Sequence, residues 1–318
     1  MSKIGFDIGT TNVKAVLFDE QHHVLQKESI AIKTDYNDKG FAEQSVEEIL
    51  QAVFTLIHHL NREDVTHISF SSAMHSLILT NKNKQAFTPN IIWADNRAAS
   101  IIDQFKQHFD WLSFYQKTGT PIHPMSPFAK LLWFKGIGVL QDDMYIFGIK
   151  EYVIFQLTGE FVMDYSLASA TGLMNLNRLE WDEEILSFLE IKDEQLPSLV
   201  DVTTEIQAKD YAFKVVMGAS DGCLVNLGSG ALHKGQTTLT IGTSGAVRMT
   251  VNTPVLDEFG RTFSYYLKKD TYVIGGPVNN GGNVIDWIAQ LLYPNKDECY
   301  KEMPNILNTI EIGAHGLI

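Results

Sequence analysis

Two stretches far apart in the chain share one pattern: a strand, a Gly-Thr-(Thr/Ser) turn, and a second strand with a cation just after the turn. The stretches are residues 7–14 (DIGTTNVK) and residues 240–248 (TIGTSGAVR). Ahead of the first turn, Ile4, Phe6 and Ile8 alternate with smaller or polar residues, which is the period-2 pattern of a β-strand. Two such turns predict two related domains that each begin with a hairpin. If the hairpins face each other, both turns line one cleft.

The residues of these turns suit a phosphate ligand. Glycine lets the backbone approach a ligand closely, a tight turn aims successive N–H groups at one point, and the hydroxyls add donors. Neither stretch is a Walker A loop or a GxGxxG motif, and turns use Gly and Thr for ordinary reasons, so one copy alone would be weak evidence. The second copy strengthens the prediction. Asp7 strengthens it too, because Mg²⁺ binds carboxylate oxygen together with water and phosphate.

A different motif occurs at residues 216–222 (VMGASDG), where an acid stands among small residues as a strand ends and a helix begins. We expect the helix N-terminus to keep Asp221 ionised. One interpretation is an ordinary aspartate at a helix start. The other is a base that accepts a hydroxyl proton during phosphoryl transfer, a reaction that depends mainly on positioning and charge stabilisation.

Further polar residues follow strand ends, where α/β folds place their ligands. They are His75, Asp95 and Arg97, whose donors and acceptors suit a polyol. The structural alternatives are a hydrogen-bonded histidine and a local ion pair at a helix start. The residues taken singly favour these structural alternatives.

The order of elements indicates an α/β fold with a mixed sheet. Strands near residues 4–9, 13–18 and 23–32 predict an antiparallel meander, and helices then alternate with further strands. The length of 318 residues favours about two domains.

Composition narrows the functional classes. The formal net charge is −13, which disfavours nucleic acid as a partner. The two cysteines, Cys223 and Cys299, form no CxxC pair and fit a reducing compartment. No apolar run is long enough to cross a bilayer. We therefore expect a cytoplasmic protein that binds neither nucleic acid nor membrane.

In combination, these motifs resemble the FGGY carbohydrate kinase family, within the actin-like (ribonuclease H-like) ATPase superfamily. Residues 7–11 resemble its first phosphate motif, residues 241–245 its second, and residues 218–222 its catalytic-base motif. The family's motifs on the sugar-binding side resemble three stretches of this chain: Met74-His75, residues 93–97 (WADNR) and residues 118–121 (TGTP). The resemblance implies an actin-like fold whose mixed sheet joins an antiparallel meander to parallel strands flanked by helices.

Within that family the closest likeness is to the gluconate kinases. The stretches that carry it are residues 71–76 (SSAMHS), 122–127 (IHPMSP) and 221–230 (DGCLVNLGSG). Xylulose kinases usually carry Gly-Gln-Met-His where this chain has residues 72–75 (SAMH), which argues against xylulose. The implied reaction is ATP + D-gluconate → ADP + 6-phosphogluconate, with ATP and Mg²⁺ as cofactors and a sugar acid as the small-molecule partner.

The resemblance also implies residue roles. Asp221 is the base that orients and deprotonates the terminal hydroxyl, and Asp7 holds Mg²⁺ through water. The residues assigned to the ATP phosphates are Gly9, Thr10, Thr11, Lys14, Gly242, Thr243 and Ser244. The residues assigned to the substrate are Met74, His75, Asp95, Arg97 and Asp221. The candidate donors to the substrate carboxylate are Arg97, His123 and Lys130.

The family pattern divides the chain into an N-terminal sugar-binding domain, residues 1–234, and the start of a C-terminal nucleotide-binding domain, residues 235–318. The second domain is then incomplete and lacks its adenosine-binding segment. We expect little kinase activity from this polypeptide alone, and an exposed apolar surface that favours association, for which a homodimer is one form. Two alternatives stay open. One is a kinase for another polyol or ketose, such as xylulose or ribulose. The other is an actin-like or chaperone-like ATPase switch.

Overall fold

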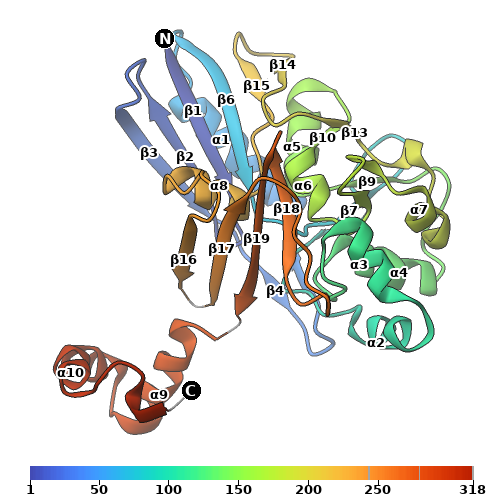
Figure 1. Cartoon of the computed structure of the whole chain (residues 1–318). Coiled ribbons are helices and arrows are strands. Elements are labelled where there is room, and N and C mark those ends of the chain that lie inside the picture. Colours follow the sequence, from blue (N-terminus) through green and yellow to red (C-terminus); the bar gives the residue numbers. More distant parts are fainter. Residues whose placement is uncertain (243, 279, 317–318) are drawn as a thin grey trace.

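The computed structural model describes residues 1–242, 244–278 and 280–316, and its main sheet has six strands in the order β14-β15-β6-β1-β2-β3 (Figure 1). β1, β2 and β3 form an antiparallel meander, β6 and β15 run parallel to β1, and β14 is antiparallel to β15. The bounds are β1 Ser2–Ile8, β2 Asn12–Phe18, β3 Val24–Ala31, β6 Val65–Ser72, β14 Glu205–Gln207 and β15 Lys214–Val216. The predicted mixed sheet is therefore confirmed.

Helices α1 (Val46–Leu60) and α5 (Ile149–Thr158) pack against this sheet and against each other. α1 begins where the Ser45 hydroxyl accepts the Glu48 N–H at 3.2 Å, which satisfies one of the free donors of the first turn. Its apolar residues recur at helical spacing and are buried. The core beneath α1 includes the inward-facing residues Ile4, Phe6 and Ile8 of β1, so the alternation in the sequence marks the buried face of the strand.

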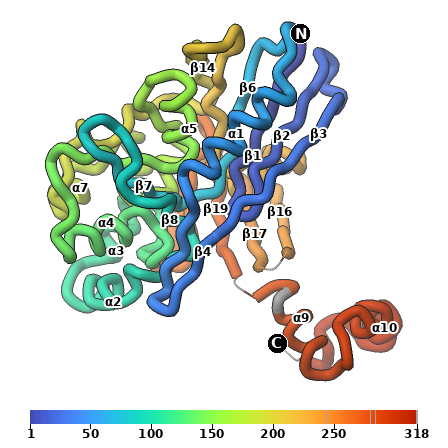
Figure 2. The backbone as a smooth tube through the Cα atoms, turned by 180° about the vertical axis from the view of Figure 1, so that it is seen from behind, coloured from blue at the N-terminus to red at the C-terminus, as the bar shows by residue number. Residues whose placement is uncertain are grey.

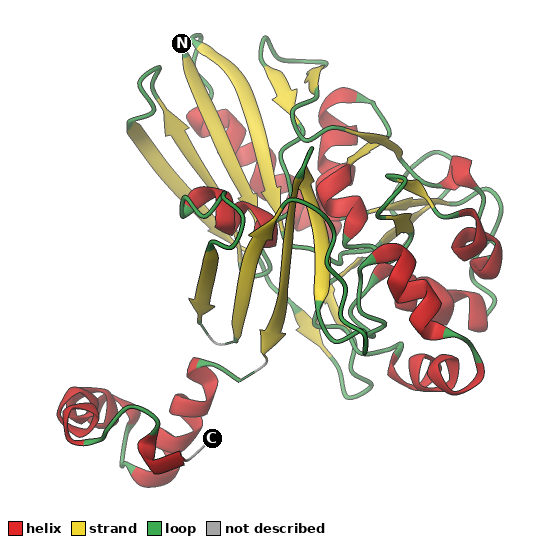
Figure 3. Ribbon diagram, viewed as in Figure 1, coloured by secondary structure: helices red, strands yellow, loops and turns green. Residues whose placement is uncertain are grey.

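A second region, rich in short helices, lies beside the main sheet (Figures 1 and 3). Its helices are α2 Ala99–His108, α3 Trp111–Thr118, α4 Pro127–Gly136, α6 Tyr165–Ser169 and α7 Glu183–Leu189. Its short strands are β4 Asp35–Tyr36, β5 Ala42–Gln44, β7 Ile78–Thr80, β8 Asn90–Ile91, β9 Tyr145–Phe147, β10 Val162–Asp164, β11 Met174–Asn175, β12 Glu180–Trp181 and β13 Ser198–Val200. A cluster of phenylalanine rings that includes Phe105, Phe114 and Phe128 forms the centre of its own core.

A second sheet stands next to the first, as two opposite views show (Figures 1 and 2). Its four antiparallel strands follow the order β16-β17-β19-β18. The bounds are β16 Thr237–Ile241, β17 Gly245–Val251, β18 Phe263–Lys268 and β19 Thr271–Val278. Helix α8 (Asp221–Gly228) contacts β6 of the main sheet and strands of the second sheet. Its first residue therefore lies at the junction of the two sheets.

The last two helices, α9 (Gly282–Leu292) and α10 (Lys296–Thr309), extend away from both sheets (Figure 3). Trp287, Leu291 and Leu292 of α9 are 60%, 62% and 73% exposed, which is the exposed apolar surface that the sequence predicts. Association through this surface stays a prediction. No helix in the described part of the chain is both long enough and apolar enough to span a bilayer.

Candidate functional site

The carboxyl ends of parallel strands meet at one edge of the main sheet. Asp7 in β1 is the register partner of Ser71 in β6, and the Ser71 hydroxyl donates to Asp7 Oδ1 at 3.0 Å. The next residue of β6, Ser72, forms an isolated parallel bridge with Ser220. The chain that leaves β15 therefore passes beside the end of β6 before α8 begins. This path brings Asp221 close to Asp7.

Asp221 is the first residue of α8 and is half-buried. The preceding Ser220 caps the helix, and Asp221 Oδ1 accepts the Gly222 N–H at 2.7 Å. The pKa of Asp221 is raised to about 6, chiefly by burial, while the Gly222 N–H opposes the shift and the charge of the neighbouring Asp7 adds to it. The carboxylate is still mostly ionised at pH 7, as expected. Its pKa nevertheless moves upward, because burial and Asp7 outweigh the helix N-terminus.

Buried groups hold the segment that leads into α8. Gly218 has a φ of +67°, and a Cβ there would lie 2.1 Å from the Phe70 carbonyl oxygen, so this position requires glycine. Lys150 Nζ donates to the Met217 carbonyl at 3.0 Å and to Asp164 Oδ2 at 2.5 Å. Both side chains of this ion pair are 0% exposed. The backbone before the candidate base is therefore fixed from within the core.

The first glycine turn leaves backbone donors free. The Gly9 N–H donates to the Asn12 carbonyl at 3.0 Å, whereas the N–H groups of Thr10 and Thr11 have no acceptor among the residues that the structure describes. Lys14, two residues into β2, is exposed. The turn can therefore present two N–H groups to an anion.

The second glycine turn contacts the start of α9. The Gly242 N–H donates to the Ser244 carbonyl at 2.8 Å, and the Gly282 N–H donates to the Gly242 carbonyl at 2.7 Å. A Cβ on Gly281 would lie 2.7 Å from the same Gly242 oxygen, so this close approach requires glycine. Thr243, which the resemblance assigns to the phosphates, lies outside the described residues.

Arg248 in β17 connects the second hairpin to Asp221. Its Nη1 donates to Thr240 Oγ1 at 2.9 Å, and its Nε lies 3.6 Å from the position of a Cβ on Gly222. That Nε is buried and has no hydrogen-bond partner within residues 1–242, 244–278 and 280–316. Burial raises the pKa of Asp221, and Arg248 acts against that rise. The first hairpin thus approaches Asp221 through Asp7, and the second approaches it through Arg248.

Met74 and His75 take different places around Asp221. A Cβ on Gly222 would lie 2.6 Å from Met74 Cε, so the Met74 side chain borders the start of α8. His75 is buried, and its Nδ1 lies 2.9 Å from the Ala170 carbonyl, which requires this nitrogen to donate. Burial chiefly lowers the pKa of His75 to about 3, so the ring is neutral. In this structure His75 is a hydrogen-bonded core histidine behind Met74.

Asp95 and Arg97 form the ion pair that was the structural alternative. Arg97 donates from Nε to Asp95 Oδ1 and from Nη2 to Asp95 Oδ2, both at 2.9 Å. Nη2 also donates to Glu43 at 2.5 Å, and the Arg97 side chain is 4% exposed. Lys130 is fully buried, and its Nζ donates to the backbone carbonyls of His75, Ile91 and Ile92. Two of the three candidate donors to a substrate carboxylate are therefore already paired inside the protein.

His123 is the third candidate and is exposed. Its Nδ1 accepts the Met125 N–H at 3.2 Å, so in the neutral ring Nε2 carries the proton and can donate. Although the residue as a whole is exposed, partial loss of hydration around the ring chiefly lowers the pKa of His123, which favours the neutral ring. After burial and Lys130, His123 is among the groups that lower the pKa of His75, so the two rings are neighbours.

The residues around Asp7 fit a hydrated magnesium ion. Asp7 Oδ2 has no partner in the described part of the chain, and it lies 3.8 Å from the position of a Cβ on Gly9. The charge of Asp7 raises the pKa of the half-buried Asp221, because the two carboxylates repel each other, and a divalent cation would relieve this repulsion. Among the described residues, no group of three or more His, Cys, Asp or Glu side chains could hold a metal. A single carboxylate with water and phosphate is the donor set that Mg²⁺ accepts.

Sequence reasoning did not identify several residues that shape this site. Arg248 stands out in the sequence only as the cation after the second turn. The pair Lys150 and Asp164 carries no motif, and its members come together only in the fold. The contact between the second turn and the start of α9, made by the Gly282 N–H, was not identified either. The glycine pair at 281–282 was the available signal for that contact.

Comparisons with known proteins agree on one family. The model of the FGGY family of carbohydrate kinases, N-terminal domain, matches residues 2–238. Gluconokinase of Bacillus subtilis is 42% identical over 99% of this chain, and the chain spans 66% of that relative's length. Xylulose kinase of Staphylococcus xylosus is 25% identical over 99% of this chain.

Solved structures agree with the sequence relatives. A gluconate kinase from Lactobacillus acidophilus superposes with a TM-score of 0.93 at 38% identity, covering 100% of this chain and 67% of its own. A structure described as ligand-bound xylulose kinase from the same organism gives a TM-score of 0.92 at 38% identity, with the same coverage of both chains. These superpositions confirm the predicted fold class.

Proposed function

The chain belongs to the FGGY family of carbohydrate kinases, and from this premise we propose that it serves the ATP-dependent phosphorylation of a sugar acid, D-gluconate, to 6-phosphogluconate. The observation that carries the proposal is the approach of both hairpins to Asp221, through Asp7 and Arg248. The choice of gluconate is supported by the 42% identity to gluconokinase of Bacillus subtilis, against 25% to xylulose kinase of Staphylococcus xylosus. The two Lactobacillus acidophilus structures, described as a gluconate kinase and a xylulose kinase, are equally similar at 38% identity and do not separate the two substrates. Because the chain spans 66% of those gluconokinases, the activity is proposed for the protein of which these residues form part.

In this proposal Asp221 orients the terminal hydroxyl of gluconate and accepts its proton as the oxygen attacks. The new bond joins that oxygen to the γ-phosphorus of ATP. The bond from the γ-phosphorus to the β,γ-bridging oxygen breaks, and ADP leaves with the electron pair. A pKa of about 6 suits this role, since the base is ionised at neutral pH yet basic enough to take a proton.

The two glycine turns position the phosphates. The free N–H groups of Thr10 and Thr11 donate from the first turn, and Lys14 adds positive charge. The second turn contributes Gly242, Thr243 and Ser244 in the same role. Asp7 would hold Mg²⁺, which when bound neutralises charge on the phosphates. On the sugar side we propose Met74 as a direct border, with His75, Asp95 and Arg97 around it.

The first test compares polyols by thermal unfolding of the chain. A ligand that binds only the folded state raises its stability by about 2.7 kcal/mol at a concentration of 100 times its Kd. We expect D-gluconate to raise the melting temperature, and xylulose, ribulose and glycerol to do so much less. Protection by xylulose alone would make the protein a ketose kinase. Protection by ATP with no effect of any polyol would favour the ATPase switch.

His123 is our candidate for recognition of the substrate carboxylate, because among the three candidates its Nε2 is the donor with no hydrogen-bond partner in the described part of the chain. His123→Ala should weaken gluconate binding about tenfold, the loss expected for one hydrogen bond to a charged group. Binding of xylitol, which has no carboxylate, should stay unchanged. Isothermal titration of both ligands measures this. Equal losses for the two ligands, or no loss for gluconate, would exclude His123 from carboxylate recognition.

A further inference from the structure

Two buried primary amides stand behind the first glycine turn, and the proposed reaction does not use them. We propose that Gln44 and Asn90 are positioning residues that aim the Thr11 N–H at the phosphate chain, through a relay that ends on the Thr10 carbonyl. This inference rests on the proposed function, because it assigns the turn to an anion. Neither amide would contact substrate.

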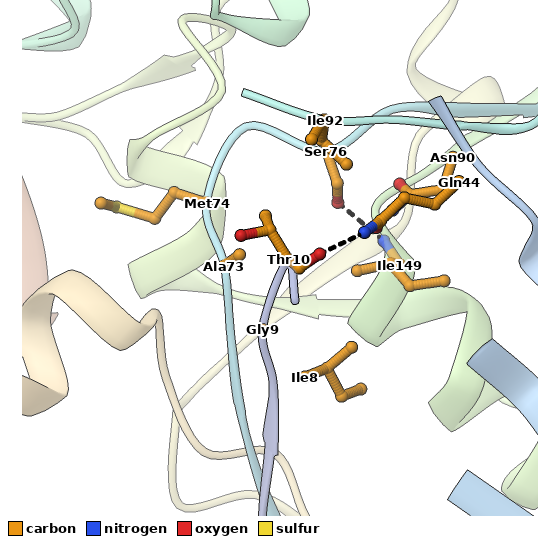
Figure 4. Close-up of a pocket in the computed structure, with 10 residues that line it drawn as sticks. All are labelled: Ile8, Gly9, Thr10, Gln44, Ala73, Met74, Ser76, Asn90, Ile92 and Ile149. Carbon is orange, nitrogen blue, oxygen red and sulfur yellow. Dashed lines mark hydrogen bonds between the residues drawn. The ribbon is translucent and has the colours of Figure 1, made fainter. Parts of the chain in front are cut away.

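The hydrogen bonds of this relay are donated in one direction, from Asn90 to Gln44 and from Gln44 to the Thr10 carbonyl (Figure 4). Asn90 Nδ2 donates to Gln44 Oε1 at 3.1 Å, and Gln44 Nε2 donates to the Thr10 carbonyl at 2.6 Å. The second proton of Gln44 Nε2 goes to Thr34 Oγ1 at 3.0 Å. Gln44 and Asn90 are 3% and 2% exposed, and they are register partners in the short sheet of β5 and β8. Thr10, Gln44 and Asn90 line the same small pocket.

Holding the Thr10 carbonyl fixes the next N–H. A trans peptide unit is planar, so the carbonyl of Thr10 and the N–H of Thr11 point in opposite directions. Gln44 at 2.6 Å, with a longer contact from the Thr34 hydroxyl at 3.4 Å, draws that carbonyl inward, and the Thr11 N–H therefore points outward. Thr11 is exposed, and its N–H has no acceptor in the part of the chain that the structure describes. The donor is available on the side from which a ligand would come.

Asn90 sets which way the Gln44 amide faces. A reversed Gln44 would turn its oxygen toward the Thr10 oxygen and its nitrogen toward Asn90. The reversal is opposed at both ends, because two oxygens would face each other at Thr10 and two nitrogen donors would face each other at Asn90. Among the described residues the Asn90 side chain makes only this hydrogen bond, and its Oδ1 has no partner. A buried amide with this single contact is better explained by orienting Gln44 than by general stability.

The test replaces each amide by its isosteric acid, which cannot donate when ionised. Gln44→Glu sets a carboxylate against the Thr10 carbonyl. Asn90→Asp lets Gln44 reverse although the turn itself is untouched. We expect each variant to bind inorganic pyrophosphate with Mg²⁺ about tenfold more weakly. The double variant should lose little more than either single one, because both act on the same contact.

Gln195, which is distant in the sequence from Gln44 and Asn90, is the site of a matched control variant. It is 5% exposed, and its Nε2 donates to the carbonyls of Gln141 and Met144 at 2.9 and 3.0 Å. Gln195→Glu therefore also buries an acid against two carbonyl groups. Gln195→Glu should lower the melting temperature, as we also expect of Gln44→Glu and Asn90→Asp. Its affinity for pyrophosphate should stay at the wild-type value. Gluconate affinity should be unchanged in all of these variants.

Isothermal titration with pyrophosphate and with gluconate separates the outcomes. Tenfold weaker pyrophosphate binding in Gln44→Glu and Asn90→Asp but not in Gln195→Glu supports the relay. Unchanged pyrophosphate affinity in the relay variants overturns the relay and leaves the proposed kinase function standing. Failure of the wild-type chain to bind pyrophosphate overturns the assignment of the turn to an anion, and the relay with it. Failure of the sugar assignment would appear only in the gluconate titration.

Discussion

Asp221→Asn is expected to abolish phosphoryl transfer to gluconate and, at alkaline pH, to make the folded protein more stable. The amide keeps the shape of the carboxylate but cannot accept the hydroxyl proton, and removal of a general base typically costs about 100- to 10,000-fold in rate. The ionised carboxylate destabilises the folded state, because burial and the nearby Asp7 raise its pKa to about 6. An uncharged side chain removes both of these unfavourable contributions.

The gain in stability should depend on pH in a defined window. The folded carboxyl has a pKa of about 6, above its ordinary value of 3.8, so the folded state binds its proton more tightly than the unfolded chain does. Above about pH 6 the folded state carries the full cost of the ionised group. As the pH falls the folded carboxyl takes up its proton, and the advantage of asparagine is lost by about pH 4. We expect a gain of about 1–2 kcal/mol at pH 8.

Urea unfolding of the chain at pH 8 and pH 4 measures the effect on stability, and a coupled kinase assay of the protein for which the activity is proposed measures the effect on rate. The exposed Asp103 on α2 is the control, and Asp103→Asn should change neither stability nor rate. A near-normal rate in Asp221→Asn would remove Asp221 from the role of base. Loss of stability at pH 8 would show that the carboxylate is more favourably placed than its surroundings indicate.

The largest expected loss of stability follows from Lys150→Met. This change leaves Asp164 buried without its cation, and breaking a buried ion pair on one side typically costs about 3–5 kcal/mol. It also frees the Met217 carbonyl, which Lys150 holds just before the segment that leads to Asp221. Denaturant unfolding should report the loss, and gluconate affinity should fall with it.

Two further variants test whether the loss of stability comes from breaking the buried ion pair or from the replacement of a lysine as such. Lys150→Met combined with Asp164→Asn should recover most of the loss, since asparagine can still accept the Leu167 N–H at the start of α6. The surface pair of Lys192 and Asp142 is the matched control, with side chains 52% and 77% exposed. Lys192→Met should cost about 1 kcal/mol or less. Equal losses for Lys150→Met and Lys192→Met would contradict the importance given to burial.

The sequence predicts those parts of the site that are formed by contiguous residues. Each glycine turn and the start of α8 are contiguous motifs, so their elements could be recognised without a fold. The meander and the parallel strands were predictable for the same reason, because alternation of buried residues is a property of each strand. The upward shift in the pKa of Asp221 was not predictable, because burial and Asp7 act through space while the helix N-terminus is visible in the sequence.

The supporting residues could not be found from the sequence because nothing local marks them. Gln44 and Asn90 are 46 positions apart and become neighbours only when β5 pairs with β8. Lys150 belongs to no motif in the sequence, yet it is 0% exposed and paired with Asp164. Arg97 and Lys130 were candidate donors to the substrate carboxylate, whereas the fold pairs both of them internally. Charged and polar residues near the site were recognised in the sequence, but their hydrogen-bond and ion-pair partners depend on tertiary packing.

A crystal structure of the chain with Mn²⁺, a non-hydrolysable ATP analogue and gluconate would test the central claim most directly. We predict phosphate density between residues 9–11 and residues 242–245, with the metal beside Asp7. The terminal hydroxyl of gluconate should then lie within hydrogen-bonding distance of the Asp221 carboxylate. Phosphates bound away from either turn, or a gluconate whose hydroxyl lies out of reach of Asp221, would contradict the account.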